Sequence, residues 1–182
     1  LAFRTEPFGS PGWWTAAVTA NLLTDGKSSP LVHDLVVDRQ LAQDVSAYVY
    51  PTEEVGVFLL VATARPGVDI ERLAERIREH LDGLAAPAAS PSAPGWLAAL
   101  DSELERAQRR TLAGIYSELQ TLDHRADLLS QYTTFFDAPE LAWSEAAAYQ
   151  QVDIGAVRAF AAARLGAPNS AQLVVEPAGE RA

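Results

Sequence analysis

The spacing of apolar positions in the first third of the chain predicts two helices followed by two strands. Apolar residues recur at helical intervals over 14–22, and a second helix is expected from about Pro30 to Asp38. Residues 44–50 then predict a strand, and 56–64 are apolar on both faces, which is typical of a central strand covered on both sides. A polar turn separates these two strands, so they are expected to pair as a β-hairpin.

The rest of the chain is predicted to be mostly helical. Asp69 caps a third, clearly amphipathic helix, and residues 85–95, rich in Pro, Ala and Ser, form a connector expected to be mobile and exposed. A long helix with a near-heptad apolar stripe starts at about Gly95, and another helix covers 128–136. Asp153 caps the last helix, which precedes a closing strand.

The order of the predicted elements indicates the fold class. Residues 1–4 read as a first strand and 171–176 as the closing strand, with the helices grouped between the strands rather than alternating with them. Strict alternation is required for a doubly wound parallel sheet, so we predict an α+β fold, an antiparallel sheet with helices packed on one face. Residues 1–182 are expected to form a single domain.

A small polar loop, Thr24–Ser29, lies between the first two helices. Gly26-Lys27-Ser28 matches the second half of a phosphate-binding P-loop, but Asn21 stands where the first glycine should be, and a helix rather than a strand precedes the loop. Nucleotide binding is therefore not expected. Gly26 is suited to close the first helix, and Ser29-Pro30 to start the second.

Composition narrows the possible functions. The formal net charge of −10 disfavours binding to nucleic acid, and the longest apolar run is far too short to cross a membrane. The chain lacks cysteine, which excludes disulfides and thiol chemistry but leaves the compartment undetermined, with a cytoplasmic location slightly favoured. It begins at Leu1 inside an apparent strand and contains no Met, so we interpret it as a fragment of a longer protein.

Several segments, in order, resemble the second domain of one half of the insulinase/pitrilysin family of zinc metallopeptidases, which includes the mitochondrial processing peptidases. The stretch 22–50, LLTDGKSSPLVHDLVVDRQLAQDVSAYVY, is similar to the family's helix, Gly/Ser-rich loop, helix and strand, with Leu41-Ala42 at its Leu-Ala position. The long helix and the helix after it, 101–132, and the closing unit, 152–177, also match. The resemblance implies a chamber wall of a peptidase, with Gly26, Ser28 and Ser29 facing substrate or partner.

Two departures from the family pattern are informative. The zinc motif His-x-x-Glu-His is absent, so the resemblance implies no catalytic residue, no metal ligand and no cofactor in this chain, with zinc in the parent enzyme or its partner. Active members also carry an Arg and, seven residues later, a Tyr that bind the substrate backbone. Here these substrate-binding positions hold Val36 and Gln43, and valine cannot donate a charge-assisted hydrogen bond.

Two functions remain open at this point. One is a non-catalytic domain of a zinc metallopeptidase that contributes chamber wall and contacts between halves. Its expected partners are the missing upstream domain, a second peptidase half as homo- or heterodimer, and a peptide substrate. The other is a structural or interaction domain of the same fold without any proteolytic role. The absence of the Arg/Tyr pair is compatible with both functions.

Isolated polar residues favour ordinary structural roles. His33, His80 and His124 each have a carboxylate as a sequence neighbour, but neighbours on a helix do not share a face, so we expect surface or boundary histidines. The Trp13-Trp14 pair could form a binding patch, yet Trp14 lies at core spacing. The acids at 101, 103 and 105 diverge around a helix and are typical of a helix start rather than a calcium site.

Overall fold

The computed structural model describes residues 1–87 and 95–176. Residues 88–94 of the predicted connector therefore lie outside the described part. The elements in chain order are β1 (Ala2–Thr5), α1 (Pro11–Thr24), α2 (Pro30–Val32), the π-helix η1 (His33–Asp38), β2 (Ala42–Tyr50), β3 (Gly56–Ala64), α3 (Ile70–Ala85), η2 (Gly95–Ala99), α4 (Leu100–Glu118), α5 (Leu122–Phe136), η3 (Pro139–Ser144), α6 (Glu145–Gln150), α7 (Ile154–Arg164), η4 (Ala167–Asn169) and β4 (Ser170–Ala171).

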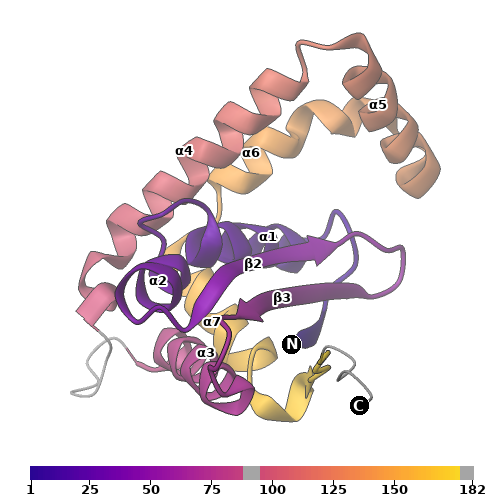
Figure 1. Ribbon diagram of the computed structural model, residues 1–182. Helices are drawn as coiled ribbons and strands as arrows, with labels where there is room; N and C mark the ends of the chain where they lie inside the picture. Colours follow the sequence, from indigo (N-terminus) through magenta and orange to yellow (C-terminus); the bar gives the residue numbers. More distant parts are fainter. Residues whose placement is uncertain (88–94, 177–182) are drawn as a thin grey trace.

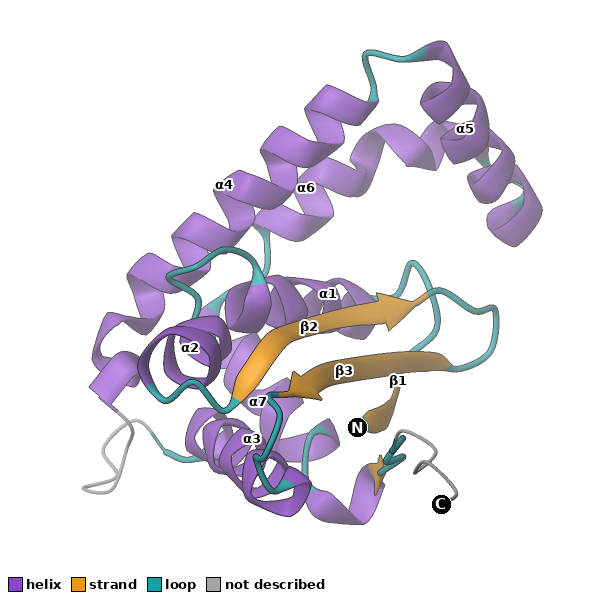
Figure 2. Cartoon of the chain, in the orientation of Figure 1, coloured by secondary structure: helices purple, strands orange, loops and turns teal. Residues whose placement is uncertain are grey.

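The strands form one antiparallel sheet in the order β2-β3-β1-β4. Helices α1 and α7 lie against one face of this sheet and α3 packs on α7, while the opposite face of β2 and β3 has no helix over it (Figures 1 and 2). The α+β class with helices on one face is thus confirmed. The predicted β2–β3 hairpin is also present, with Tyr48 opposite Leu59 and Tyr50 opposite Val57.

Helix α1 is the centre of the hydrophobic core. Ser10 caps its first turn by accepting a hydrogen bond from the Trp13 backbone N–H at 3.2 Å. The helix is buried on most of its circumference, because the sheet covers one side and α4, α6 and α7 cover others. Both Trp13 and Trp14 are buried, so the tryptophan pair belongs to the core and does not form a surface patch.

Helix α4 begins against this core and then leaves it. Its predicted apolar stripe is buried at Leu100, Leu104 and Ala107, where it packs on α1 rather than on the sheet. Beyond this contact the chain extends away from the sheet through the end of α4 to α5, and it returns through η3 and α6, which runs beside α4 and reaches α1 (Figure 1). We call residues 112–150 the arm.

An aromatic cluster ties the arm back to the core. The Phe8 ring contacts Trp13 and Trp14 on α1 at centroid distances of 4.8 and 6.0 Å. On its other side the same ring contacts three aromatic residues of α5 at 5.3–5.6 Å, namely Tyr132, Phe135 and Phe136. A single side chain in the loop before α1 thus joins α5 to the body of the domain.

The arm contains an acid whose pKa lies near neutrality. Burial, and to a smaller extent the charge of Glu118, raise the pKa of Glu145 to about 7, while His124 partly opposes the shift. A carboxyl group with a raised folded-state pKa keeps a proton that the unfolded chain releases above about pH 4. The folded state therefore loses stability as the pH rises from about 4 to 7.

Glu145→Gln is accordingly expected to stabilise the protein at pH 8 and to change little at pH 5. The full shift corresponds to at most about 3 kcal/mol, and partial exposure reduces this, so we expect a gain of about 1 kcal/mol. The measurement is urea unfolding at both pH values, with the exposed arm residue Glu140→Gln as the matched control. Equal gains at both pH values, or equal gains in the control, would contradict the assignment.

Four sequence predictions need correction. Strand β3 was expected to be covered on both sides, but Val61 is 45% exposed, because helices pack on only one face of the sheet. The second helix is α-helical only to Val32 and continues as a π-helix, because the Arg39 N–H reaches back five residues to Asp34 O at 2.9 Å. The strand expected from residue 44 begins at Ala42, with a bulge at Gln43. The closing strand is limited to Ser170–Ala171, since within the described residues its pairing with β1 covers only Phe3 and Ala2.

Candidate functional site

Arginine side chains of α4 hold the loop between α1 and α2 in place. Gly26 adopts φ +95, the left-handed conformation expected for a residue that ends a helix. Asp25 accepts two hydrogen bonds from Arg110, at 2.7 and 2.8 Å, and its backbone oxygen accepts one from Arg106 at 2.6 Å. A Cβ atom added to Gly26 would lie 3.6 Å from both guanidiniums, so α4 covers this glycine.

The two serines of the loop have different environments. Ser29 is fully buried, and its hydroxyl donates to Gly26 O at 2.7 Å instead of capping α2. Ser28 is exposed and borders a surface pocket described below. Among the loop residues singled out from the sequence, Ser28 is the one whose side chain reaches the surface, whereas Gly26 and Ser29 shape the turn.

Val36 and Gln43 lie on either side of a tight chain reversal. Gln40 provides the turn at φ +52, and the Leu41 N–H donates to Leu35 O at 2.8 Å. The Arg65 side chain then donates both to Val36 O, at 3.4 Å, and to the carbonyl of the residue before Gln43, at 3.1 Å. One guanidinium thus bridges the backbone at the two positions. Val36 is partly buried against the core, and Gln43 is exposed at the bulge.

An ionic cluster joins η1 to α3 beside this reversal. Asp34 accepts hydrogen bonds from Arg76 at 2.7 and 3.2 Å, from Arg39 at 2.9 Å and from His80 Nε2 at 3.0 Å. Burial alone would raise the pKa of Asp34, but the hydrogen bonds from Arg76, His80 and Arg39 outweigh it and hold that pKa below its usual range.

His80 contradicts the expectation of a surface histidine. Its side chain is 2% exposed, and its partner Asp34 lies 46 positions away on another helix. Burial lowers the pKa of His80 more than the Asp34 carboxylate raises it, so the imidazole is neutral at pH 7 and donates from Nε2. Sequence neighbours could not reveal this pair because it forms only when η1 packs on α3. His33 and His124 are exposed, as predicted.

A pocket of about 900 Å³ opens beside the ionic cluster. Its lining includes Ser28, His33, Asp34, Arg76, His80, Trp96 and Glu103. Within the described residues no three His, Asp or Glu side chains are grouped so that they could hold a metal ion. The carboxylate of Asp34 already accepts hydrogen bonds from two arginines and a histidine, so it is not free to activate a nucleophile.

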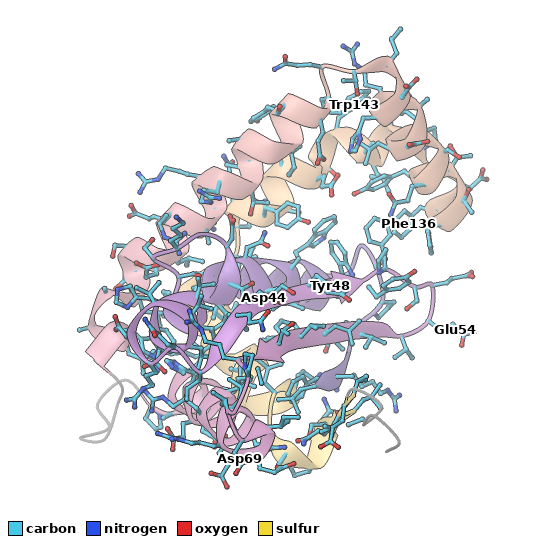
Figure 3. The ribbon with its side chains drawn as sticks, viewed as in Figure 1. Asp44, Tyr48, Glu54, Asp69, Phe136 and Trp143 are labelled. Atoms are coloured by element: carbon cyan, nitrogen blue, oxygen red, sulfur yellow. The ribbon has the colours of Figure 1, made fainter. Side chains whose placement is uncertain are left out.

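The face of the sheet that no helix covers carries exposed apolar and aromatic side chains. Cross-strand pairing places Tyr48 beside Leu59, Tyr50 beside Val57 and Ser46 beside Val61. Tyr48, Tyr50 and Val61 are 45%, 59% and 45% exposed. Figure 3 shows Asp44 and Tyr48 along β2, with Phe136 of the arm at one end of the same region. We call this surface, defined by residues 44, 46, 48, 50, 57, 59, 61 and 63, the open face.

Comparison with known proteins connects this architecture to a family. A family profile described as Peptidase M16 inactive domain matches residues 1–91. The chain belongs to the M16 peptidase family. The match covers both the loop and the open face, and it confirms the resemblance to a non-catalytic domain of a zinc metallopeptidase. Curated proteins contain no match to this M16 chain.

Solved structures share the fold of this M16 domain. A protease from Helicobacter pylori is 18% identical with a TM-score of 0.78, over 92% of this chain and 38% of that one. The inactive peptidase domain of a proposed zinc protease from Bordetella parapertussis is 21% identical with a TM-score of 0.75, over 100% and 94%. A chain of complex III2 from Candida albicans is 13% identical with a TM-score of 0.69, over 90% and 40%. The M16 domain thus spans well under half of the H. pylori protease.

Proposed function

We propose that this domain forms a non-catalytic wall of a peptidase chamber, and that the zinc-dependent hydrolysis is carried out elsewhere in the parent enzyme or by its partner. The observation that carries the proposal is the asymmetry of the sheet. Helices cover one face, whereas the open face presents tyrosine and aliphatic side chains to solvent. Such a surface is suited to contact an extended peptide, since aromatic rings and backbone amides bind many sequences without selecting one.

Residues next to the open face support its proposed role as the surface that faces the substrate. Strand β2 lies at the outer edge of the sheet, so its outward backbone groups have no strand partner among the described residues. Exposed Gln43 lies at the start of that edge, and exposed Ser28 lies on the loop before it. We propose these as substrate-facing positions, with Val36 and Gln43 in place of the Arg and Tyr of active family members. Gly26 and Ser29 would act by shaping the loop.

The arm supports a second part of the proposal, contact with the remainder of the enzyme. Exposed apolar side chains gather on it, with Leu122 78% and Trp143 57% exposed. An upstream domain of the same half or a second half, as homo- or heterodimer, would cover them. The M16 family match and the partial coverage of the H. pylori protease favour a larger assembly.

The test is peptide hydrolysis by the assembled enzyme, prepared from this chain joined to its zinc-bearing region or mixed with its zinc-bearing partner. Tyr48→Ser combined with Val61→Ser is expected to lower kcat/KM about tenfold, because each side chain loses contact area with the peptide. The zinc content should not change. The control is Arg72→Ala, an exposed residue of α3 on the helical side.

A purely structural role in the same fold is the alternative, and the absent Arg/Tyr pair is equally compatible with it. Under that alternative the double serine variant and the Arg72→Ala control would have equal kcat/KM. An unchanged kcat/KM in an enzyme that remains assembled would therefore reject the chamber-wall role and leave the structural one.

A further inference from the structure

The pocket beside the ionic cluster has walls from three parts of the chain. One wall is the π-helix η1, the second is the middle of α3, and the third is η2 with the start of α4. In the π-helical register, residues five apart lie about one turn apart, so His33 and Asp38 pair at 3.0 Å. Both line the pocket together with Asp34. Short π-helical segments are frequent at functional sites, which distinguishes this wall from an ordinary helix face.

Carboxylates outnumber cations around the pocket. Its lining includes one arginine, Arg76, while Arg39 and Arg106 bind acids of the lining from outside it. Five carboxylates against these three guanidiniums leave a formal net charge of −2 with the histidines counted as neutral. Asp82 is exposed and, among the described residues, forms no ion pair like those that engage the other four acids. The five acids are Asp34, Asp38, Glu79, Asp82 and Glu103.

A buried acceptor is also left over in the α3 wall. His80 donates from Nε2 to Asp34 and is neutral, so its Nδ1 can only accept a hydrogen bond. Among the described residues this Nδ1 has no partner, although the side chain is only 2% exposed. Unpaired buried acceptors are uncommon and destabilising, and a ligand with an N–H donor would satisfy this one.

Trp96 provides an aromatic surface next to His80. The centroids of the two rings lie 5.8 Å apart at an interplanar angle of 33°. Trp96 is partly exposed and lines the pocket. A tryptophan ring close to carboxylates is an environment that binds ammonium and guanidinium groups, because the face of the ring attracts positive charge. The Trp96 Nε1–H also has no partner among the described residues, and it would donate to an oxygen atom of a ligand.

We propose that this pocket binds an organic cation with N–H donors, a guanidinium or an ammonium group. The excess of carboxylates attracts the positive charge, Asp82 is its counter-ion, and the Trp96 ring lies against it. One N–H donates to His80 Nδ1. Because that nitrogen is covered by protein atoms, the Trp96 ring has to shift when the ligand enters. The inference concerns a different surface from the open face and does not depend on the chamber-wall role.

The experiment follows the indole N–H signals of the four tryptophans by NMR in the 182-residue chain. The probes are N-acetyl-arginine amide, for a basic side chain of a peptide, and butylguanidine, for a free cation. N-acetyl-citrulline amide is the neutral control, because it has nearly the same shape as the arginine probe without its charge. The Trp96 signal, assigned by its loss in Trp96→Phe, is expected to shift saturably with a dissociation constant of about 1 mM or below. The citrulline amide should bind at least about tenfold more weakly.

Two variants of α3 locate the site. Asp82→Asn is expected to weaken binding of the charged probes at least about threefold. Glu75→Gln is the matched control, because this acid is exposed on the same helix but is not part of the pocket lining, and it should leave binding unchanged. The NMR spectra also verify that both variants fold. Tighter binding of the arginine amide than of butylguanidine would support a peptide ligand, and equal or weaker binding would support a free cation.

Three results would overturn the proposal. One is the absence of a saturable shift at Trp96 with either charged probe. Another is binding of the citrulline amide as tight as that of the arginine amide, which would mean that the pocket does not select for charge. The third is equal weakening in Asp82→Asn and Glu75→Gln, which would mean that the cations are attracted by the acidic chain as a whole.

Discussion

Replacing Phe8 with Ala is expected to lower the free energy of unfolding by about 3–5 kcal/mol, the usual cost of removing a buried phenylalanine. The ring is 6% exposed and contacts five other aromatic rings, two on α1 and three on α5. Its loss leaves a cavity at the junction of the body and the arm. Urea unfolding followed by tryptophan fluorescence measures the change, since Trp13 and Trp14 border the cavity.

The arm itself provides the control for this prediction. Tyr116→Ala removes an aromatic side chain of similar size that is 57% exposed, and it is expected to change stability by less than about 0.5 kcal/mol. In the Phe8→Ala protein, amides of α5 should also exchange faster than those of α1. A decrease in the free energy of unfolding below about 1 kcal/mol, or no selective effect on α5, would contradict the conclusion that Phe8 connects α5 to the body of the domain.

Asp34→Ala is expected to lower the free energy of unfolding by about 2–4 kcal/mol at pH 7. The substitution removes the common acceptor of Arg39, Arg76 and His80, and it leaves a buried imidazole N–H without a partner. Asp38→Ala is the matched control, because that carboxylate pairs with His33 at the surface, with both side chains more than half exposed. The control should lose less than about 1 kcal/mol.

The pH dependence of stability provides a second test of the same cluster. The pKa of His80 is lowered in the folded state, so its contribution is present above about pH 6.5 and is lost as the pH falls below that value. The pKa of Asp34 is also lowered, so its contribution is present above about pH 4 and is lost at lower pH. The deficit of Asp34→Ala should therefore shrink at pH 3. A deficit that is constant from pH 7 to pH 3 would contradict the ionic account.

The periodicity of apolar residues predicted those elements whose pattern is set by their own residues rather than by a distant partner. The amphipathic α3 and the stripe of α4 have patterns that a single helix dictates. The caps at Asp69 and Asp153 were predicted for the same reason, and each accepts a backbone N–H, from Glu71 at 3.0 Å and from Ala156 at 2.7 Å. Local rules of periodicity and helix capping were sufficient to predict these helices and caps. The apolar run of β3 predicted the strand itself, but not that one of its faces would remain open.

Features that depend on a distant partner were not predictable in this way. The cluster around Asp34 needs η1 and α3, which only the packed fold brings together. The closing strand was overestimated because its sequence has strand character along 172–176, yet a strand also requires a neighbour. The substrate positions Val36 and Gln43 were placed by resemblance alone, and their role in binding stays a prediction.

The most direct test of the central claim is the zinc content and peptidase activity of the purified chain. Elemental analysis after mild chelation, paired with an assay on unstructured peptides with added zinc, is expected to find neither stoichiometric zinc nor hydrolysis. The expectation rests on the missing His-x-x-Glu-His motif and on the Asp34 cluster, whose acceptor groups are already engaged. One equivalent of zinc that survives chelation, together with peptide cleavage, would contradict the account of this M16 domain as a non-catalytic wall.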